Sequence, residues 1–156
     1  MLNQPEDTKQ ESWHRFFAVA ANNRAWQLAE DYSGEAGAAE LLNAAHAAAF
    51  HWQAVGTELH NMRAKMLLAQ AHSLVGHGRC ALAYAQEVRS YFLAKSDTPD
   101  WELAFVHSIH AHAASVAGET QQHVASYAAA VKAMKAITGV EDRDIVAKTF
   151  RQVPSP

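Results

Sequence analysis

Hydrophobic residues recur every three or four positions along most of the chain, the spacing that places side chains on one face of an α-helix. Glycines and prolines fall between these periodic segments rather than inside them. Glycine commonly follows the last residue of a helix, and proline is favoured at the first helical position. The pattern therefore predicts six long helices and a short seventh, at residues 12–33, 36–55, 58–75, 79–95, 99–117, 121–138 and 141–150.

Threonines precede three of these segments. Thr57, Thr98 and Thr120 are expected to cap the helices that follow them, because a threonine hydroxyl can accept a hydrogen bond from a free backbone N–H of the first turn. Residues 1–11 are polar and are expected to form a flexible leader. Residues 151–156 contain two prolines, which cannot continue a helix, and are expected to form a flexible tail.

A sequence repeat relates the helices to one another. Gly34, Gly76 and Gly118 lie 42 residues apart. With the same shift, hydrophobic positions of the preceding helices superpose in sets of three: Phe17, Leu59 and Trp101; Ala25, Leu67 and Ile109; Tyr32, Leu74 and Val116. The repeat predicts an all-α fold in which antiparallel helical hairpins stack as a short α-solenoid, because a hairpin with one apolar face needs a neighbour to cover it. An up-and-down bundle of the same helices is the alternative.

The predicted domain organisation follows from this repeat. Three hairpins would span residues 12–55, 58–95 and 99–138, and the helix at 141–150 would cap the stack. With 156 residues, one helical domain at 12–150 accounts for the chain. A composition of 49% hydrophobic and 19% charged residues excludes a disordered or low-complexity chain.

Charge and cysteine content narrow the classes of partner. The formal net charge of −3 provides no attraction to nucleic acid, and no nucleic-acid partner is expected. The longest apolar run, Ala44–Phe50, is interrupted by His46 and is far shorter than the ~20 residues that span a bilayer, so no membrane association is expected. A single cysteine, Cys80, rules out an intramolecular disulfide and suits the reducing cytoplasm.

Two segments resemble the tetratricopeptide repeat, a family of helical hairpins. They have its order of small residues, glycine and an aromatic residue: Ala69, Ala71, Gly76, Ala81, Tyr84 and Ala85 within Leu67–Phe92, and Ala111, Gly118 and Tyr127 within Ile109–Met134. The period of 42 is longer than the family consensus, and His123 replaces the small residue that Ala81 supplies. The resemblance implies that the predicted stack of hairpins is a short tetratricopeptide-like α-solenoid and, by analogy with the family, a protein-interaction scaffold.

A narrower resemblance covers residues 40–150. It rests on four short segments: His51-Trp52, Val55-Gly56-Thr57, Leu103-Ala104-Phe105 and Glu141-Asp142-Arg143. Together these are similar to uncharacterised bacterial tetratricopeptide-like proteins. The resemblance implies a bacterial, cytoplasmic setting and no particular reaction.

The first helix of each hairpin carries a strip of mixed polar and aromatic residues. A continuous surface formed by such helices would suit a bound peptide, since it offers an aromatic anchor and scattered polar groups. The candidate groove residues are Asn23, Trp26, Glu30, Asn61, Lys65, His72, His107 and His110. The alternative is that this strip packs against neighbouring helices and that the other face, with Arg24, Arg63, Gln70 and Ser115, lines the concave surface.

Ten histidines raise the question of a metal site. Only His107 and His110 have the spacing of three or four that lets two residues of one helix face the same ion. No metal site and no cofactor are expected. If a site exists, His51, His107 and His110 are its candidate ligands.

No catalytic motif is found, and the sequence predicts a non-enzymatic scaffold or adaptor that binds an unknown protein or peptide. Cys80 is expected to be a buried, unreactive thiol beside Tyr84 and Val88. The exposed ends of so short a stack would also allow a homodimer. The alternative function is a small helical metal- or ligand-dependent enzyme that uses His51, His72, His107 and His110.

Overall fold

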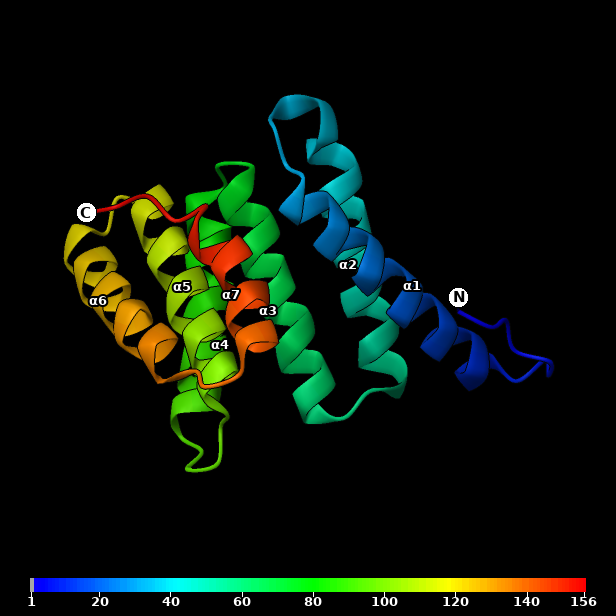
Figure 1. Ribbon diagram of the computed structural model, residues 1–156. Helices are drawn as coiled ribbons and strands as arrows, with labels where there is room; N and C mark the ends of the chain where they lie inside the picture. The colour runs from blue at the N-terminus through cyan, green and yellow to red at the C-terminus, as the bar shows by residue number, and fades with distance from the viewer. Residues whose placement is uncertain (1) are drawn as a thin grey trace.

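The computed structural model describes residues 2–156 (Figure 1), and Met1 lies outside the described residues. The helices are α1 (Gln10–Glu30), a short 3-10 helix η1 (Glu35–Gly37), α2 (Ala38–Val55), α3 (Glu58–Leu74), α4 (Gly78–Leu93), α5 (Asp100–Ala117), α6 (Thr120–Ala136) and α7 (Val140–Phe150). No strand is present in this part of the chain. The prediction of an all-α fold is confirmed, and each predicted helix is found within a few residues of its expected ends.

The ends of the helices follow from local chemistry. Gly76 and Gly118 end α3 and α5 with φ angles of +81° and +78°, a conformation that other residues adopt only with strain. The Thr57 hydroxyl accepts a hydrogen bond from the His60 backbone N–H, so the predicted cap of α3 is present. Thr98 differs from its prediction, because its hydroxyl donates to the Phe92 carbonyl at 2.9 Å and satisfies the end of α4 instead.

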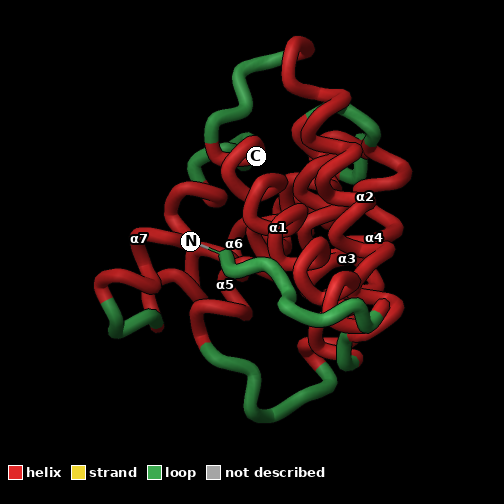
Figure 2. The backbone as a smooth tube through the Cα atoms, turned by 90° about the vertical axis from the view of Figure 1, so that its right-hand side faces the viewer, coloured by secondary structure: helices red, strands yellow, loops and turns green. Residues whose placement is uncertain are grey.

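The helices form two layers. The inner layer consists of α1, α3, α5 and α7, each of which contacts the next. The outer helices α2, α4 and α6 each pack against the inner-layer helices that precede and follow them in the chain. The connections lie at the two ends of the helices (Figure 2), as expected for antiparallel hairpins. Contacts between alternate helices are those of hairpins stacked along an axis.

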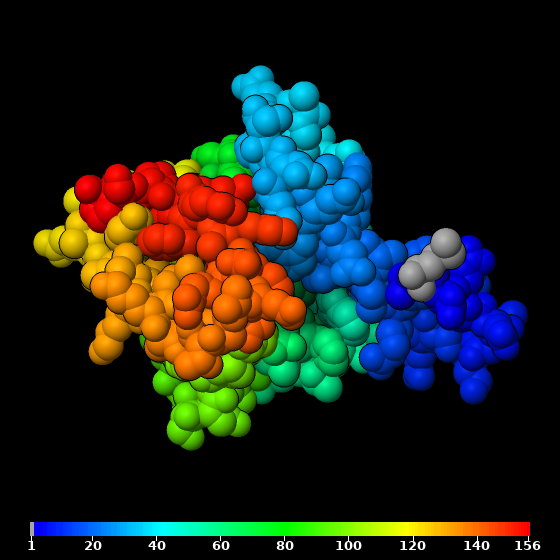
Figure 3. All heavy atoms as spheres, viewed as in Figure 1, coloured from blue at the N-terminus to red at the C-terminus, as the bar shows by residue number. Residues whose placement is uncertain are grey.

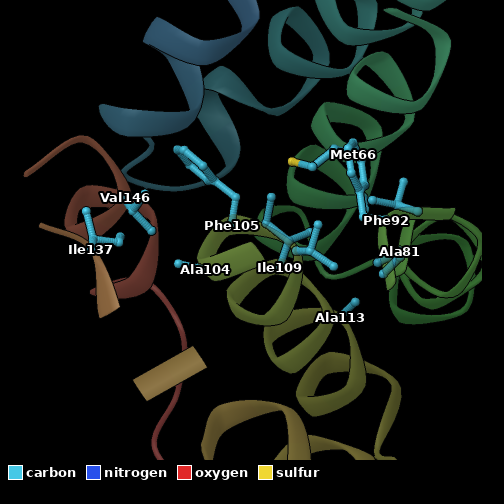
Figure 4. Packing of buried hydrophobic residues seen from close by; sticks show 13 residues of the cluster. Met66, Ala81, Phe92, Ala104, Phe105, Ile109, Ala113, Ile137 and Val146 are labelled. Atoms are coloured by element: carbon cyan, nitrogen blue, oxygen red, sulfur yellow. The ribbon is translucent and has the colours of Figure 1, made fainter. Parts of the chain in front are cut away.

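The main hydrophobic core lies around α5. Ile109 is 1% exposed and sits beside Met66 of α3 and Phe92 of α4. Ile137 and Val146 bring the C-terminal segment against the other side of α5 (Figure 4), where both are buried. A second cluster joins α1, α2 and α3 through small residues such as Ala25, which let these helices approach closely.

The C-terminal segment is packed, contrary to the prediction of a flexible tail at 151–156. Val153 is 7% exposed. The Gln152 amide donates to the Ala29 carbonyl of α1 at 2.7 Å and accepts from the Gln70 amide of α3 at 2.7 Å. These contacts hold the segment on the inner layer, because its polar groups find partners on two separate helices.

None of the helices described between residues 2 and 156 is long and apolar enough to cross a membrane.

Candidate functional site

A groove opens on the inner layer between α1 and α7, and helices α3 and α5 form its floor. We call it the inner groove. Its volume is about 320 Å³, within the usual range for ligand sites. In the space-filling view it lies at the boundary between the blue atoms of α1 and the orange and red atoms of α7 (Figure 3). Ten residues line it: Asn22, Trp26, Glu30, Arg63, Met66, Trp101, Glu102, Phe105, Ile145 and Thr149.

Aromatic rings supply most of the apolar wall. The Phe105 ring lies between two tryptophans, with its centre 5.7 Å from Trp26 and 6.3 Å from Trp101. Met66 lies on the floor and Ile145 of α7, which is 50% exposed, lies at the edge. Large, rigid side chains of this kind bury much area at little entropic cost and dominate binding at protein interfaces.

An ion pair bounds the groove on one side. The Arg63 guanidinium donates two hydrogen bonds to the Glu102 carboxylate, with N···O distances of 2.7 and 3.0 Å. Glu102 is 3% exposed, whereas the Arg63 side chain is 44% exposed and also lies 5.6 Å from the centre of the Trp101 ring. The hydrogen bonds to Glu102 raise the pKa of Arg63 above its ordinary value. The pair therefore presents a fixed, neutralised polar edge beside an apolar floor.

A second ion pair bounds the groove at the α1–α7 side. Lys148 of α7 donates to Glu30 of α1 at 2.9 Å, and both side chains are well exposed. With the Gln152 hydrogen bonds described above, this pair fixes α7 relative to α1. The two charged residues neutralise each other, so the groove carries no strong charge of either sign at its rim.

The predicted groove residues are divided between two sides of the molecule. Trp26 and Glu30 line the inner groove, and Asn23 is exposed on α1 outside its lining. Asn61 and Lys65 of α3 line a different hollow, which we call the outer groove, between α2, α3 and α4. The strip is therefore not continuous.

The division arises from the orientation of α3 and α5. Arg63 and Gln70 belong to the alternative face of α3. Arg63 lines the inner groove, and the Gln70 amide donates to Gln152 in the C-terminal segment. The connection after α1 spans residues 31–37, longer than those after α3 and α5, and leaves the first hairpin free to pack in its own register.

The three predicted groove histidines are enclosed by helices. His72 lies beside His46, His77 and Tyr84, and burial lowers its pKa. His107 is partly buried, and burial lowers its pKa as well, with Arg89 contributing. These residues contribute to packing between helices rather than to the inner groove.

His110 is part of a serine–histidine contact that resembles a nucleophile and its base. The Nδ1 atom of His110 lies 2.8 Å from the hydroxyl of Ser126 on α6. Both residues are almost fully buried, at 2% and 3% exposed, and burial lowers the pKa of His110 to about 4. A hydrogen bond that joins two helices explains this contact without any substrate.

The candidate metal ligands are not brought together. His51 of α2 pairs with His14 of α1, with 2.8 Å between their Nδ1 atoms, while His107 and His110 lie on α5 near Arg89. Within the described residues no three histidine, cysteine, aspartate or glutamate side chains are arranged to hold a metal ion.

The expectation for Cys80 is wrong, because its side chain is exposed. It lies in the first turn of α4, one position before the buried Ala81, so a rotation of one residue decides which of the two faces the core.

Sequence reasoning missed most of the residues that form the inner groove. Trp101 is one of the repeated hydrophobic positions, and such a pattern does not distinguish a core residue from a groove residue. Arg63 was a signal in the sequence for this groove, because it belongs to the alternative face that would line the concave surface.

A scan against protein-family models, a search of curated proteins and a search of solved structures each returned no match.

Proposed function

We propose that the protein is a non-enzymatic binding module that captures a protein segment in the inner groove. The supporting observation is the wall formed by Trp26, Trp101 and Phe105, three large rings that line one accessible hollow. Trp26 and Trp101 are partly buried, whereas Phe105, which is 9% exposed, belongs to the main core. Partly exposed tryptophans that line a groove are typical of binding surfaces. The tetratricopeptide resemblance supports the same class of function, and the proposed setting is the cytoplasm of a bacterium.

The chemistry of the lining defines the ligand. The floor is apolar, and the charged residues at the rim are paired with each other: Arg63 with Glu102, and Lys148 with Glu30. A strongly acidic or basic segment would find no excess of opposite charge there. The preferred ligand is a segment with one or two bulky apolar side chains, such as Leu, Met or Phe, flanked by uncharged polar residues.

The enzymatic alternative receives no support from the arrangement of its residues. His51, His72, His107 and His110 were its candidate centre. His51 contacts His14, His72 contacts His46 and His77, and only His107 and His110 lie near each other, on α5, where His110 bonds to Ser126.

The experiment uses a library of random dodecapeptides displayed on phage, selected on the full-length, tag-free protein. Selected peptides are then measured by fluorescence polarisation against matched variants of α7. Ile145→Glu places a charge at the edge of the inner groove, at a position that is 50% exposed. Val140→Glu makes a similar change on the same helix at a position that is 68% exposed and outside the groove. A third variant, Lys65→Glu, probes the outer groove.

The proposal predicts peptides rich in bulky apolar residues that lose at least about tenfold in affinity with Ile145→Glu, a loss of about 1.4 kcal/mol. Val140→Glu and Lys65→Glu should bind as tightly as the wild type. Peptides that bind all three variants equally would place the site elsewhere. A selection that enriches no sequence would remove the support for a peptide-binding role.

A further inference from the structure

Two histidines meet at the turn between α3 and α4. The Nδ1 atom of His72, in the last turn of α3, lies 3.2 Å from the Nδ1 atom of His77, which directly precedes α4. The His72 side chain is 7% exposed, whereas His77 is exposed. The Tyr84 ring of α4 stacks on the His72 ring, with 5.9 Å between the ring centres, and limits its movement. Neither histidine lines the inner groove.

The backbone of the turn holds the two histidines together. The His77 N–H donates to the His72 carbonyl at 2.8 Å, and the Gly76 N–H donates to the Ser73 carbonyl at 3.2 Å. Gly76 has a φ of +81°. These features form the Schellman motif of a helix end, in which two residues five positions apart become neighbours. Because the backbone fixes both residues, the two imidazoles meet without the ordering of a flexible loop.

The same turn forms elsewhere in the chain without histidines. At the end of α5, the Glu119 N–H donates to the Ala114 carbonyl at 2.9 Å, and Gly118 has a φ of +78°. Ala114 and Glu119 lie 42 residues after His72 and His77, which is the period of the sequence repeat. The usual side-chain contact between these two positions is hydrophobic. The turn therefore does not need two imidazoles in order to form.

The separation of the two nitrogens fits a shared metal ion. Zinc binds imidazole nitrogen at about 2.0–2.1 Å, and a tetrahedral angle between two such bonds places the nitrogens about 3.3–3.4 Å apart. The 3.2 Å between His72 and His77 is close to this value. Another pair, His14 with His51, has only 2.8 Å between its Nδ1 atoms, which suits a shared proton and is too short for two ligands of a tetrahedral ion.

The turn is accessible to an ion and borders the outer groove. His46 of α2 lies 5.4 Å from His72 between ring centres, and it lines the outer groove together with Tyr84. Among the described residues no third ligand is in place, so water would complete the coordination of an ion, as in zinc sites that keep an open position. Lys65, a cation that also lines the outer groove, is paired with Glu87.

We propose that His72 and His77 form a zinc-binding site that holds the end of α3 to the start of α4. Zinc is well suited to imidazole ligands, whereas magnesium and calcium prefer oxygen. Two of the four ligands of a structural site should supply about half of its binding free energy, which corresponds to a dissociation constant on the order of 1–100 µM. The proposal goes beyond the capture of a segment in the inner groove and is independent of it, because the two sites share no residue.

Calorimetric titration of the tag-free full chain with Zn²⁺ at about pH 7.5, after removal of bound metal with a chelator, tests the proposal. The wild type should bind about one equivalent of Zn²⁺ and no Mg²⁺. His77→Gln should weaken zinc binding at least about tenfold, because one of two protein ligands is lost. His77 is exposed and its side chain makes no capping hydrogen bond to α4, so this variant should keep its fold. His14→Gln is the matched control from the pair with the shorter spacing, and it should bind zinc as the wild type does.

A second variant and a spectroscopic signal identify the ligands. His72→Ala gives the turn the residue that the equivalent turn has at Ala114, and it should weaken zinc binding as much as His77→Gln does. Circular dichroism checks that each variant remains helical. In nuclear magnetic resonance spectra of the imidazole nitrogens, zinc should shift the Nδ1 signals of His72 and His77 and leave those of His14 unchanged.

Three outcomes would overturn the proposal. A wild type that binds no zinc would mean that His72 and His77 share only a proton. Zinc binding that survives His77→Gln, or that is lost in His14→Gln, would place the ion on other histidines. Peptide binding at the inner groove should be unchanged in His77→Gln, so failure of the zinc site and failure of the groove proposal are distinguishable.

Discussion

Two regions of this molecule differ in how completely their apolar side chains are covered. At the C-terminal end, α7 and the segment after it bury Val146 and Val153 and satisfy polar groups on α1, α3 and α6. At the N-terminal end, the first hairpin leaves Phe17 and Phe50 in contact with solvent. The C-terminal segment covers the inner face of α3 and α5, and we call this region the closed end. Phe17 and Phe50 have no such cover in the described chain, and we call this part of the first hairpin the open end.

The two regions should contribute to different properties: the closed end to the stability of the fold, and the open end to association with other molecules. The closed end holds the most buried polar groups, among them His110, His112 and Gln70, each of which depends on the surrounding helices to exclude water. The open end holds exposed rings that contribute little to the folded state until something covers them. Substitutions at the closed end should therefore change the free energy of unfolding, whereas those at the open end should change association.

Acid should produce the largest effect, and it should act at the closed end. Burial lowers the pKa of His110 and of His112 to about 4, with Arg89 and His107 adding to the shift at His110 and His123 adding at His112. Both groups bind protons more readily when unfolded, near pH 6.5, so stability is complete above that pH and falls as the pH drops toward 4. The expected loss is on the order of 2–3 kcal/mol for each histidine.

Urea unfolding at about pH 7 and about pH 4.5 measures this loss. His112→Leu is the informative variant, because the Nδ1 atom of His112 has no hydrogen-bond partner among the described residues. It should reduce the difference between the two pH values by roughly 2 kcal/mol. His14→Gln, at the open end, should alter this pH-dependent difference in the free energy of unfolding much less. If both variants reduced the difference equally, the loss of stability in acid could not be assigned to the closed end.

The next largest effect should come from a matched pair of phenylalanines. Phe92 is 1% exposed in the main core, whereas Phe50 of α2 is 65% exposed at the open end. Phe92→Ala should lower the free energy of unfolding by about 3–5 kcal/mol, because it removes buried area and leaves a cavity. Phe50→Ala should change it by less than about 0.5 kcal/mol in the monomer. Chemical denaturation at low protein concentration compares them, and similar losses would mean that the open end is covered within the single chain.

The helices themselves could be predicted from the sequence because their ends depend on local chemistry. Gly76 and Gly118 adopt conformations that suit glycine, and Thr57 caps the helix that it precedes. These effects act over one helical turn and need no knowledge of neighbouring helices. The all-α fold and the approximate helix limits follow from them.

The side of each helix that faces the groove could not be predicted, because it depends on how the hairpins rotate against one another. Trp26 shares its repeat position with Leu68 and His110, yet Trp26 lines the inner groove, Leu68 lines the outer groove and His110 bonds to Ser126. A rotation of about 100°, the angle between adjacent residues of a helix, is enough to exchange these roles. Cys80 and Ala81 show the same sensitivity at the start of α4.

The packing of residues 151–156 could not be predicted for a different reason. Two prolines correctly indicate that residues 151–156 do not continue α7, but a segment outside a helix can still be ordered by tertiary contacts. Gln152 is held by Gln70 and Ala29, which lie far from it in the sequence. No local pattern reveals such partners.

The smallest expected effect concerns these same contacts, which close the C-terminal end over the inner layer. Gln152→Ala should remove both hydrogen bonds and leave the Gln70 amide, which is fully buried, without its partner. The expected loss is about 1–2 kcal/mol, since an unsatisfied buried amide costs more than an exposed one. Gln86→Ala is the matched control, because Gln86 is exposed and bonds only to Gln122 at 3.3 Å. Hydrogen exchange should show faster opening of α7 in Gln152→Ala than in Gln86→Ala, while α2 at the open end exchanges at the same rate in both. Equal protection of α7 in the two variants would mean that burial of Val146 and Val153 alone closes this end, and that the polar contacts only set the position of the segment.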